Sequence, residues 1–396
     1  MSTKKGLYKF KPLVFQPVKP IGNLKDGTPL PMPRSGHRIV CYGMSFYSFG
    51  GYNPKISSDD YLDEIWHRTQ PLFQELWKFN IVSNTWTRIE GLGSMPEELA
   101  SHSAVQVGPN MLVFGGTGMP FGDSSSDSLY MCHLPTGRWQ KVLTYGSKPL
   151  PMYGQGVCVS DGKLYVVGGT TGYLYSIDVH CLDLTTRVWD QLSAKVRNMM
   201  SNPEERYRHE IVEHGSCLYV FGGGRSRAAC QLSHLPTFNI TERAWSHTET
   251  RADPTIGTFP QARRCHIASK VNNYVYVHGG YDGAEAFADL WRIDLQTFCW
   301  EKLPHKSPVP LYFHSAAVTE EPCMYMFGGV KSLLEEKRTA RVTKVWLTIG
   351  KLQYICWEAL CHYAPNITSL PPASLLQMGI PSYIVDNLQH QTPACG

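Results

Sequence analysis

The feature that most constrains this 396-residue chain is a glycine pair that ends an apolar run and occurs six times. A β-branched or aromatic run that stops at two glycines predicts a buried strand followed by a turn. Glycine suits that turn because a Cβ atom would clash where the backbone reverses close to its neighbour. The period of roughly 50 residues predicts a repeat architecture with one small sheet per repeat. The first glycines of the six pairs are Gly50, Gly115, Gly168, Gly222, Gly279 and Gly328.

Two further marks keep register with the glycine pairs. A polar residue stands 13 residues before the first glycine in five copies and 14 residues before it in the last, and a tryptophan follows five of the pairs. The polar residues, which we call the blade-start residues, are His37, His102, Gln155, His209, His266 and His314. The tryptophans are Trp86, Trp139, Trp189, Trp245 and Trp300. With these marks the chain resembles the kelch-repeat family over residues 34–347. The resemblance implies an all-β fold, a six-bladed kelch propeller.

Composition and charge narrow the class of protein. A net charge of +4 with 18% charged residues gives no support for binding nucleic acid or a membrane through bulk charge. No stretch approaches the ~18 apolar residues of a membrane span, and the lysine-rich start lacks the apolar run of a signal peptide. The 12 cysteines include no Cys-x-x-Cys pair. We therefore expect an intracellular protein with reduced thiols, in the cytoplasm, the nucleus or both.

Two segments outside the regular repeats have alternative interpretations. Residues 1–33 either form a disordered tail or supply a strand that closes the sixth blade, and closure is favoured because an open ring would expose sheet edges. Residues 52–75 form a long aromatic loop in the first repeat, either a functional loop or one packed over its blade. The loop includes Tyr52, Tyr61, Trp66, His67, Arg68 and Phe73.

After residue 347 the apolar period changes from that of strands to that of helices. Leu352, Ile355, Cys356, Ala359, Leu360 and Tyr363 recur on one face of an amphipathic helix that Pro365 ends. Two shorter helices are predicted over residues 373–378 and 381–388. Residues 348–390 therefore form a small helical module, followed by a flexible tail over residues 391–396. A module of ~40 residues cannot build a core alone and should need a partner.

Arginines outside the repeat register are the strongest binding-site candidates. Loops after the glycine pairs and loops leading into the next blade should meet at one end of the propeller, where several guanidinium groups suit a carboxylate or phosphate. Arg34, Arg206 and Arg263 each precede the blade-start histidine by three residues, so we interpret them as structural. The predicted substrate-binding residues are Arg208, Arg225, Arg227 and Arg264, with Tyr153, Tyr207 and Tyr281 as walls.

Catalytic motifs are not found in the sequence. It contains no Gly-x-Ser-x-Gly, no His-Glu-x-x-His and no phosphate-binding loop, and no His/Tyr/Cys or carboxylate set stands out as metal ligands. We expect a binding protein rather than an enzyme, with no cofactor and no metal.

The helical module carries a second resemblance. Residues 352–360 fit Leu-x-x-x-Cys-x-x-x-Leu, which looks like the BC-box that binds the elongin B/C adaptor, although Lys351 departs from the small residue usual before it. Leu370, Pro371 and Leu375 look like a cullin-selecting box. The whole chain is thus similar to kelch domain-containing substrate receptors of elongin B/C–cullin-2 ubiquitin ligases. The adaptor-binding residues that the resemblance implies are Leu352, Ile355, Cys356 and Leu360.

That resemblance implies a function. Such receptors bind the C-terminal tails of client proteins, often ending in glycine or alanine, which is the kind of ligand that an arginine cluster recognises. The alternative is a non-catalytic kelch scaffold or cytoskeletal interaction protein, whose helices are a structural cap. The chain itself ends in Cys395-Gly396, so its tail either enters a neighbouring copy's pocket, giving self-association, or is an ordinary frayed terminus.

Overall fold

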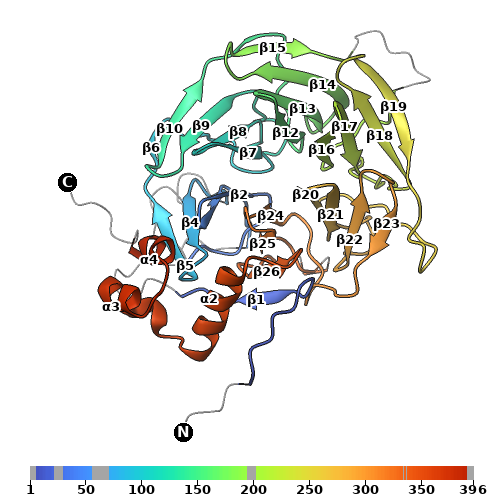
Figure 1. Cartoon of the computed structure of the whole chain (residues 1–396). Coiled ribbons are helices and arrows are strands. Elements are labelled where there is room, and N and C mark those ends of the chain that lie inside the picture. Colours follow the sequence, from blue (N-terminus) through green and yellow to red (C-terminus); the bar gives the residue numbers. More distant parts are fainter. Residues whose placement is uncertain are drawn as a thin grey trace.

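The computed structural model describes residues 6–21, 30–55, 71–193, 202–332, 334–335 and 337–389. Six sheets are arranged in a ring, with helices beside the ring near the end of the chain (Figure 1). The all-β, six-bladed propeller with a helical module that the sequence predicts is confirmed. None of the described helices is long and apolar enough to cross a membrane.

The first three blades each contain four antiparallel strands in chain order. Blade one consists of β2 (Arg38–Tyr42), β3 (Ser45–Phe49), β4 (Leu76–Asn80) and β5 (Thr85–Ile89). Blade two consists of β7 (Ser103–Val107), β8 (Asn110–Phe114), β9 (Leu129–His133) and β10 (Arg138–Val142). Blade three consists of β12 (Gly156–Ser160), β13 (Lys163–Thr170), β14 (Tyr175–Asp183) and β15 (Val188–Gln191). Blades two and three each add a short parallel outer strand, β6 (Leu92–Gly93) and β11 (Tyr145–Gly146).

The other three blades follow the same plan. Blade four consists of β16 (Glu210–His214), β17 (Cys217–Phe221), β18 (His234–Asn239) and β19 (Ala244–Glu249). Blade five consists of β20 (Ile267–Val271), β21 (Tyr274–His278), β22 (Leu290–Asp294) and β23 (Trp300–Lys302). Blade six consists of β24 (Ser315–Val318), β25 (Cys323–Phe327), β26 (Val342–Trp346) and β1 (Gln16–Val18). The first strand of every blade lies nearest the axis, and these strands neighbour one another in a closed ring.

The two ends of the propeller meet in blade six. β1 pairs antiparallel with β26, with Pro17 opposite Thr343. The strand lies just after the apolar alternation that suggested ring closure, and the preceding residues hold it in place: the Leu13 amide donates to the Trp346 carbonyl at 2.7 Å, and Phe15 is buried. The outer edge of the last blade is therefore covered by a strand from the start of the chain.

The glycine pairs and the blade-start residues form one joint between neighbouring blades. A Cβ atom on Gly279 would lie 2.4 Å from the Leu311 carbonyl oxygen and 2.7 Å from the His314 ring. The last copy closes the ring in the same way, because a Cβ atom on Gly328 would lie 2.4 Å from His37. The two marks seen in the sequence are thus the two sides of one close contact, which explains why they keep register.

The three arginines in repeat register hold the blades from within, as interpreted from the sequence. Arg34, Arg206 and Arg263 are buried, and the Nη1 of each donates to the carbonyl of the first glycine of its blade at 3.0–3.2 Å. Two of them also pair with carboxylates, Arg34 with the buried Glu75 at 2.7 Å and Arg263 with the partly buried Asp289 at 2.8 Å. These guanidinium groups are fully engaged in the fold and are not available to a ligand.

Gly279→Ala should destabilise the propeller by at least about 3 kcal/mol, because the new methyl group meets backbone and the φ angle of +67° is unfavourable for alanine. Chemical denaturation followed by tryptophan fluorescence measures the loss. Gly108→Ala is the control, since Gly108 also has a positive φ of +56° but nothing within 4 Å of a Cβ atom, so its loss should be about 1 kcal/mol. Equal losses in the two variants would show that the glycine joint is not closely packed.

Acid should unfold this propeller. Burial, with further contributions from nearby arginines, lowers the pKa of His102, His209 and His266 to about 3. Between pH 6.5 and about 3 the unfolded chain binds protons that the folded chain does not, so stability falls as the pH falls, by about 1.4 kcal/mol per pH unit for each histidine. Thermal unfolding at a series of pH values measures the slope.

The chain supplies its own control for this slope. Gln155 occupies the blade-start position of blade three and lies against Gly115 as the histidines lie against their glycines. His266→Gln should therefore keep the joint while removing one titrating group, and the slope between pH 6.5 and 4 should flatten by about one third of the three-histidine contribution. An unchanged slope would mean that His266 does not drive the acid sensitivity.

The helical module packs on blade one and blade six. It contains α2 (Leu352–Tyr363), the 3₁₀-helix η2 (Ile367–Ser369), α3 (Pro372–Gln377) and α4 (Ser382–Gln389). Its core joins Trp357, Leu375 and Ile384 to Val82 in the turn between β4 and β5. The Trp357 indole N–H donates to the Val82 carbonyl at 3.1 Å. The partner that the small module needs is therefore, at least in part, the propeller itself.

Candidate functional site

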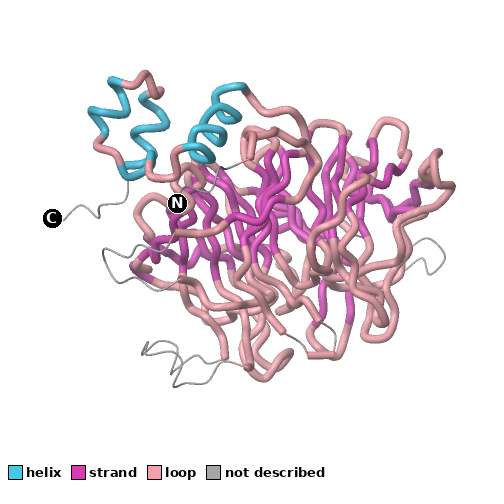
Figure 2. The backbone as a smooth tube through the Cα atoms, turned by 90° about the horizontal axis from the view of Figure 1, so that it is seen from below, coloured by secondary structure: helices cyan, strands magenta, loops and turns pink. Residues whose placement is uncertain are grey.

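Strand order separates the propeller into two faces. The turns inside the β2–β3 and β4–β5 hairpins lie at one end of each blade, and the loops after the glycine pairs lie at the other. The helical module rests on the first face, as Figure 2 shows from the side. Each face carries one candidate binding surface: the loop face has a cleft, and the helical face has a helix with exposed apolar side chains.

A ring of six backbone hydrogen bonds builds the mouth of the propeller on the loop face. Each participating residue directly precedes a blade-start residue, has a φ between +55° and +69°, and donates its amide to the carbonyl of its counterpart in the neighbouring blade at 2.8–3.0 Å. We call these residues the mouth ring; they are Gly36, Ser101, Gly154, Arg208, Cys265 and Phe313. Four of the six side chains are small or missing, so the mouth is open except at the arginine and the phenylalanine.

A cleft of about 220 Å³ lies over the mouth ring. Four mouth-ring residues line it, together with side chains from the surrounding loops and from the segments that lead into the blades. The lining residues are Ser35, Gly36, Tyr52, Ala100, Ser101, Phe121, Tyr153, Tyr207, Arg208, Phe313 and Arg338. The cleft therefore collects residues from five blades, with two guanidinium groups among aromatic rings.

Arg208 is the central charge of the cleft. Its guanidinium lies over the Phe313 ring at 4.5 Å, and its Nη2 donates to the Ser101 hydroxyl. Its Nε is shielded from solvent and has no hydrogen-bond partner, and no carboxylate among the described residues forms an ion pair with Arg208. Burial lowers the pKa of Arg208, although an arginine stays protonated at neutral pH. The cleft thus presents a cation with unused donor capacity.

The walls of the cleft are aromatic. Tyr52 packs edge-on against Phe121, with ring centroids 4.9 Å apart, and Tyr153 packs edge-on against Tyr207 at 6.2 Å. Arg338 lies over the Tyr52 ring at 5.1 Å, and its Nε donates to the Ser35 hydroxyl at 3.1 Å. Burial raises the pKa of Tyr153 and Tyr207, so both phenols are neutral and can donate a hydrogen bond at physiological pH.

The structure brings together three of the seven predicted substrate-binding residues. Arg208, Tyr207 and Tyr153 line the cleft, whereas Arg225, Arg227, Arg264 and Tyr281 do not. The expected convergence of four arginines is therefore not what the structure shows. Arg208 differs from the other three arginines because it is a mouth-ring residue, one position before the blade-start residue His209.

The other three arginines are placed elsewhere for physical reasons. Arg264 is buried, stacks on Tyr281 at 4.8 Å, and donates to the carbonyls of Arg225 and Ser226, so it holds the loop after the fourth glycine pair. Arg225 is exposed and lies within 3.7 Å of a Glu204 carboxylate oxygen and 3.5 Å of one on Glu205. Arg227 is exposed on the same loop.

Sequence reasoning missed Ser101, Phe313 and Arg338. The first two stand one residue before a blade-start histidine, so a search at that register position would have found them. Arg338 lies in the loop between β25 and β26, nine residues after Gly329 of the sixth glycine pair. Its position in a loop after a glycine pair was therefore the signal that could have found it. Among the described residues, no group of three or more His, Cys, Asp or Glu side chains could hold a metal ion.

The helix with exposed apolar side chains is α2. Leu352 is 73% exposed, Leu360 is 39% exposed and Cys356 is exposed, while Ile355 is partly buried. The opposite side of the helix holds it to the propeller through Trp357 and through Glu358, whose carboxylate lies 2.6 Å from Lys344. Of the apolar face that the sequence predicts, Leu352, Cys356 and Leu360 are therefore exposed, while Ile355 and Ala359 are partly buried.

The residues of the cullin-like box are divided between surface and core. Leu370 is 39% exposed and Pro371 is exposed. Leu375 is only 1% exposed and belongs to the core of the module. Only Leu370 and Pro371 can contact a partner without rearrangement of the module, because the Leu375 side chain is used in packing.

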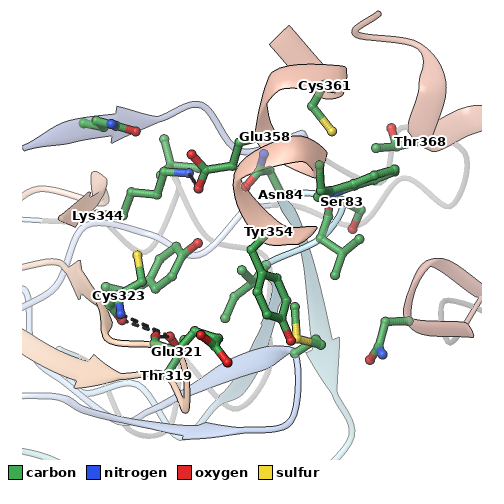
Figure 3. Close-up of a pocket in the computed structure, with 18 of the residues that line it drawn as sticks. Ser83, Asn84, Thr319, Glu321, Cys323, Lys344, Tyr354, Glu358, Cys361 and Thr368 are labelled. Carbon is green, nitrogen blue, oxygen red and sulfur yellow. Dashed lines mark hydrogen bonds and ion pairs between the residues drawn. The ribbon is translucent and has the colours of Figure 1, made fainter. Parts of the chain in front are cut away.

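A larger cavity of about 770 Å³ lies between α2 and the propeller. Figure 3 shows Glu358 beside Lys344 and Tyr354 reaching from α2 toward Thr319 and Glu321. Its Glu358 carboxylate is already paired, since it lies 2.6 Å from Lys344 and also accepts from the Trp346 indole at 3.0 Å and from the Tyr8 hydroxyl at 3.0 Å. We interpret this cavity as the joint between module and propeller rather than as a recognition site.

Two predictions concern residues outside the part of the chain that the structure describes. Tyr61, Trp66, His67 and Arg68 of the long first loop lie there. The tail at 391–396, with Cys395 and Gly396, lies there as well. Of the long loop, the described Tyr52 lines the cleft, and the Phe73 ring lies 4.1 Å from the buried Arg34 guanidinium.

Comparison with known proteins agrees with the architecture. The model of the KLHDC2/KLHL20/DRC7 kelch-repeats domain matches residues 24–223 and 195–348. The chain is 44% identical to kelch domain-containing protein 10 of Xenopus tropicalis, over 92% of this chain and 88% of that protein. The human protein of that name is 43% identical over 91% and 80%. The Drosophila melanogaster homolog is 36% identical over 91% and 62%. By its blades, its joints and these matches, the chain belongs to the KLHDC2/KLHL20/DRC7 kelch-repeats family.

Proposed function

We propose that this chain is the substrate-recognition subunit of a cullin-RING ubiquitin ligase of the elongin B/C–cullin-2 type, and is not itself a catalyst. The cleft on the loop face binds the C-terminal tail of a client protein, and α2 binds the adaptor. The observation that carries the proposal is Arg208, a shielded cation in an aromatic cleft without a carboxylate partner among the described residues. A ligand carboxylate would supply that partner.

The geometry of the cleft suits a chain end better than an internal acidic residue. A terminal carboxylate can accept from the Arg208 guanidinium and from the neighbouring phenols of Tyr153 and Tyr207, and no main chain continues beyond it. The small volume of about 220 Å³ leaves room for a residue such as glycine or alanine beside the carboxylate. Because aromatic rings crowd the cleft, we expect the last residue of the client to have a small side chain or none.

The adaptor part of the proposal rests on α2. Its exposed Leu352, Cys356 and Leu360 are spaced four residues apart and present one apolar face, as a helix docking into a groove requires. Because this face lies on the opposite side of the propeller from the cleft, client and elongin C could bind at the same time. A cullin-2-type scaffold would then contact the neighbouring Leu370–Pro371 region.

A reduced intracellular compartment, cytoplasmic or nuclear, is part of the proposal. The 11 cysteines among the described residues are all unpaired, which supports a reducing environment. The proposal includes no cofactor, metal, nucleic acid or membrane.

One alternative is favoured by a specific observation. Trp357 and Leu375 are buried between the module and blade one, as expected of a helical cap on a non-catalytic kelch scaffold. In that case the propeller would bind partners, cytoskeletal ones included, without an adaptor.

A two-part experiment tests the proposal. The full-length tagged chain is purified from cells, and elongin B, elongin C and cullin-2 are sought in the eluate. The same protein is then screened against a library of peptides with free C-termini, and the best binders are remade as C-terminal amides. Co-purification together with loss of binding on amidation supports the proposal. Absence of the adaptor favours the scaffold, and equal binding of acids and amides removes the carboxylate as the recognised group.

A further inference from the structure

A second layer of charged residues lies below the mouth ring. Arg38 and Glu210 directly follow the blade-start residues His37 and His209. Their side chains meet across the axis of the ring, with Arg38 Nη1 2.9 Å from Glu210 Oε1. Blade one and blade four are opposite each other in a ring of six, so this ion pair spans the full width of the axis. The Nε of Arg38 also donates to the His102 carbonyl at 3.3 Å, which fixes the guanidinium.

The pair lies directly beneath the cleft. Arg38 is two residues from Gly36, and Glu210 is two residues from Arg208; Gly36 and Arg208 both line the cleft. Because Arg38 lies at the axis, its positive charge reaches groups in several blades. It contributes to lowering the pKa of Arg208 and of histidines in blades two, four and five. Both side chains are partly buried, at 17% and 18% exposure, so solvent screens them less than it screens a surface pair.

We propose that the Arg38–Glu210 ion pair forms the charged floor of the cleft and determines how strongly the cleft prefers a charged chain end to a neutral one. The proposal rests on the proposed function, because the ligand is the client's terminal carboxylate held by Arg208. Glu210 alone would repel that carboxylate from below. Arg38 neutralises Glu210, so the ligand carboxylate can approach Arg208 without net repulsion from the floor. Glu210 in turn neutralises Arg38, so the floor adds no net attraction for the carboxylate.

Charge substitution separates the two members of the pair. Glu210→Gln keeps a side chain of the same length that can still accept from Arg38, but leaves the floor with a net positive charge. Its affinity for a peptide with a free carboxylate should rise by about fivefold. Arg38→Gln leaves Glu210 uncompensated, and affinity for the same peptide should fall by about fivefold or more. Neither change should alter the affinity of the amidated peptide appreciably.

The measurement uses the full-length chain and the tightest glycine-ending peptide from the library screen, as free acid and as amide. Fluorescence anisotropy gives the acid-to-amide affinity ratio, and thermal unfolding confirms that each variant is folded. Asp190→Asn is the matched control: it also removes one carboxylate from an ion pair, with Arg243 at 2.7 Å, but at the exposed rim. It should leave the ratio unchanged.

The outcomes distinguish the floor from the proposed function. A ratio that rises in Glu210→Gln and falls in Arg38→Gln supports the inference. A wild-type protein that prefers the acid, with both variants showing the wild-type ratio, overturns the role of the pair while leaving the proposed function intact. A wild-type protein that does not distinguish acid from amide contradicts the proposed function, and the inference fails with it. If Arg38→Gln does not fold, Glu210→Gln decides alone.

Discussion

Arg208→Gln is expected to weaken the binding of a client peptide with a free C-terminus by at least about thirtyfold, because removing one partner of a shielded charge-assisted contact costs ~2–5 kcal/mol. The carboxylate would enter the cleft without the only guanidinium that the mouth ring carries, and the neutral phenols of Tyr153 and Tyr207 cannot supply the lost charge. Isothermal titration calorimetry with the peptide as acid and as amide measures the effect. The amide should bind the variant and the wild type with similar, weak affinity.

The control for this substitution lies on the same face. Arg227→Gln removes an equal charge from an exposed loop residue that does not line the cleft, so its effect should stay within about threefold. Thermal unfolding excludes misfolding, since glutamine at position 208 must adopt the positive φ of +58°. Arg227→Gln weakening the peptide as much as Arg208→Gln would show that general surface charge, and not the cleft, attracts the chain end.

The double substitution Leu352→Ala with Cys356→Phe is expected to abolish elongin B/C binding. Alanine removes the side chain that would enter the adaptor's pocket, and phenylalanine is too large for the narrow space expected next to it. Both positions are exposed on α2, so the fold and the client affinity should be unchanged. Co-purification from cells and size-exclusion chromatography with purified elongin B/C measure the loss.

A matched surface control accompanies that experiment. Leu376 lies on α3, is 49% exposed and belongs to the same module, so Leu376→Ala removes a comparable side chain away from α2. It should retain elongin binding within about twofold. Adaptor binding that survives the double substitution would place the contact elsewhere and would favour the scaffold with a helical cap.

Local sequence patterns determined the framework of this protein. The glycine pairs and the polar residues 13 or 14 positions before them predicted six blades. Both marks recur because each first glycine, such as Gly279, lies against the blade-start residue of the next blade. The amphipathic period over residues 352–363 predicted α2 with the bounds that the structure shows. In each case the signal depends on residues near one another in the chain, where strand alternation, helix period and glycine turns apply.

The site depended on packing between distant segments. Arg208 and Arg225 are grouped together on sequence grounds, yet one contacts Ser101, 107 residues away, and the other lies beside Glu204 and Glu205. The Arg38–Glu210 pair joins residues 172 apart, and the burial of Leu375 arises from contact with blade one. Whether a charge is used within the fold or left for a ligand depends on which side chains surround it. The closing of the ring decides that, because it brings blades one and four to opposite sides of one axis.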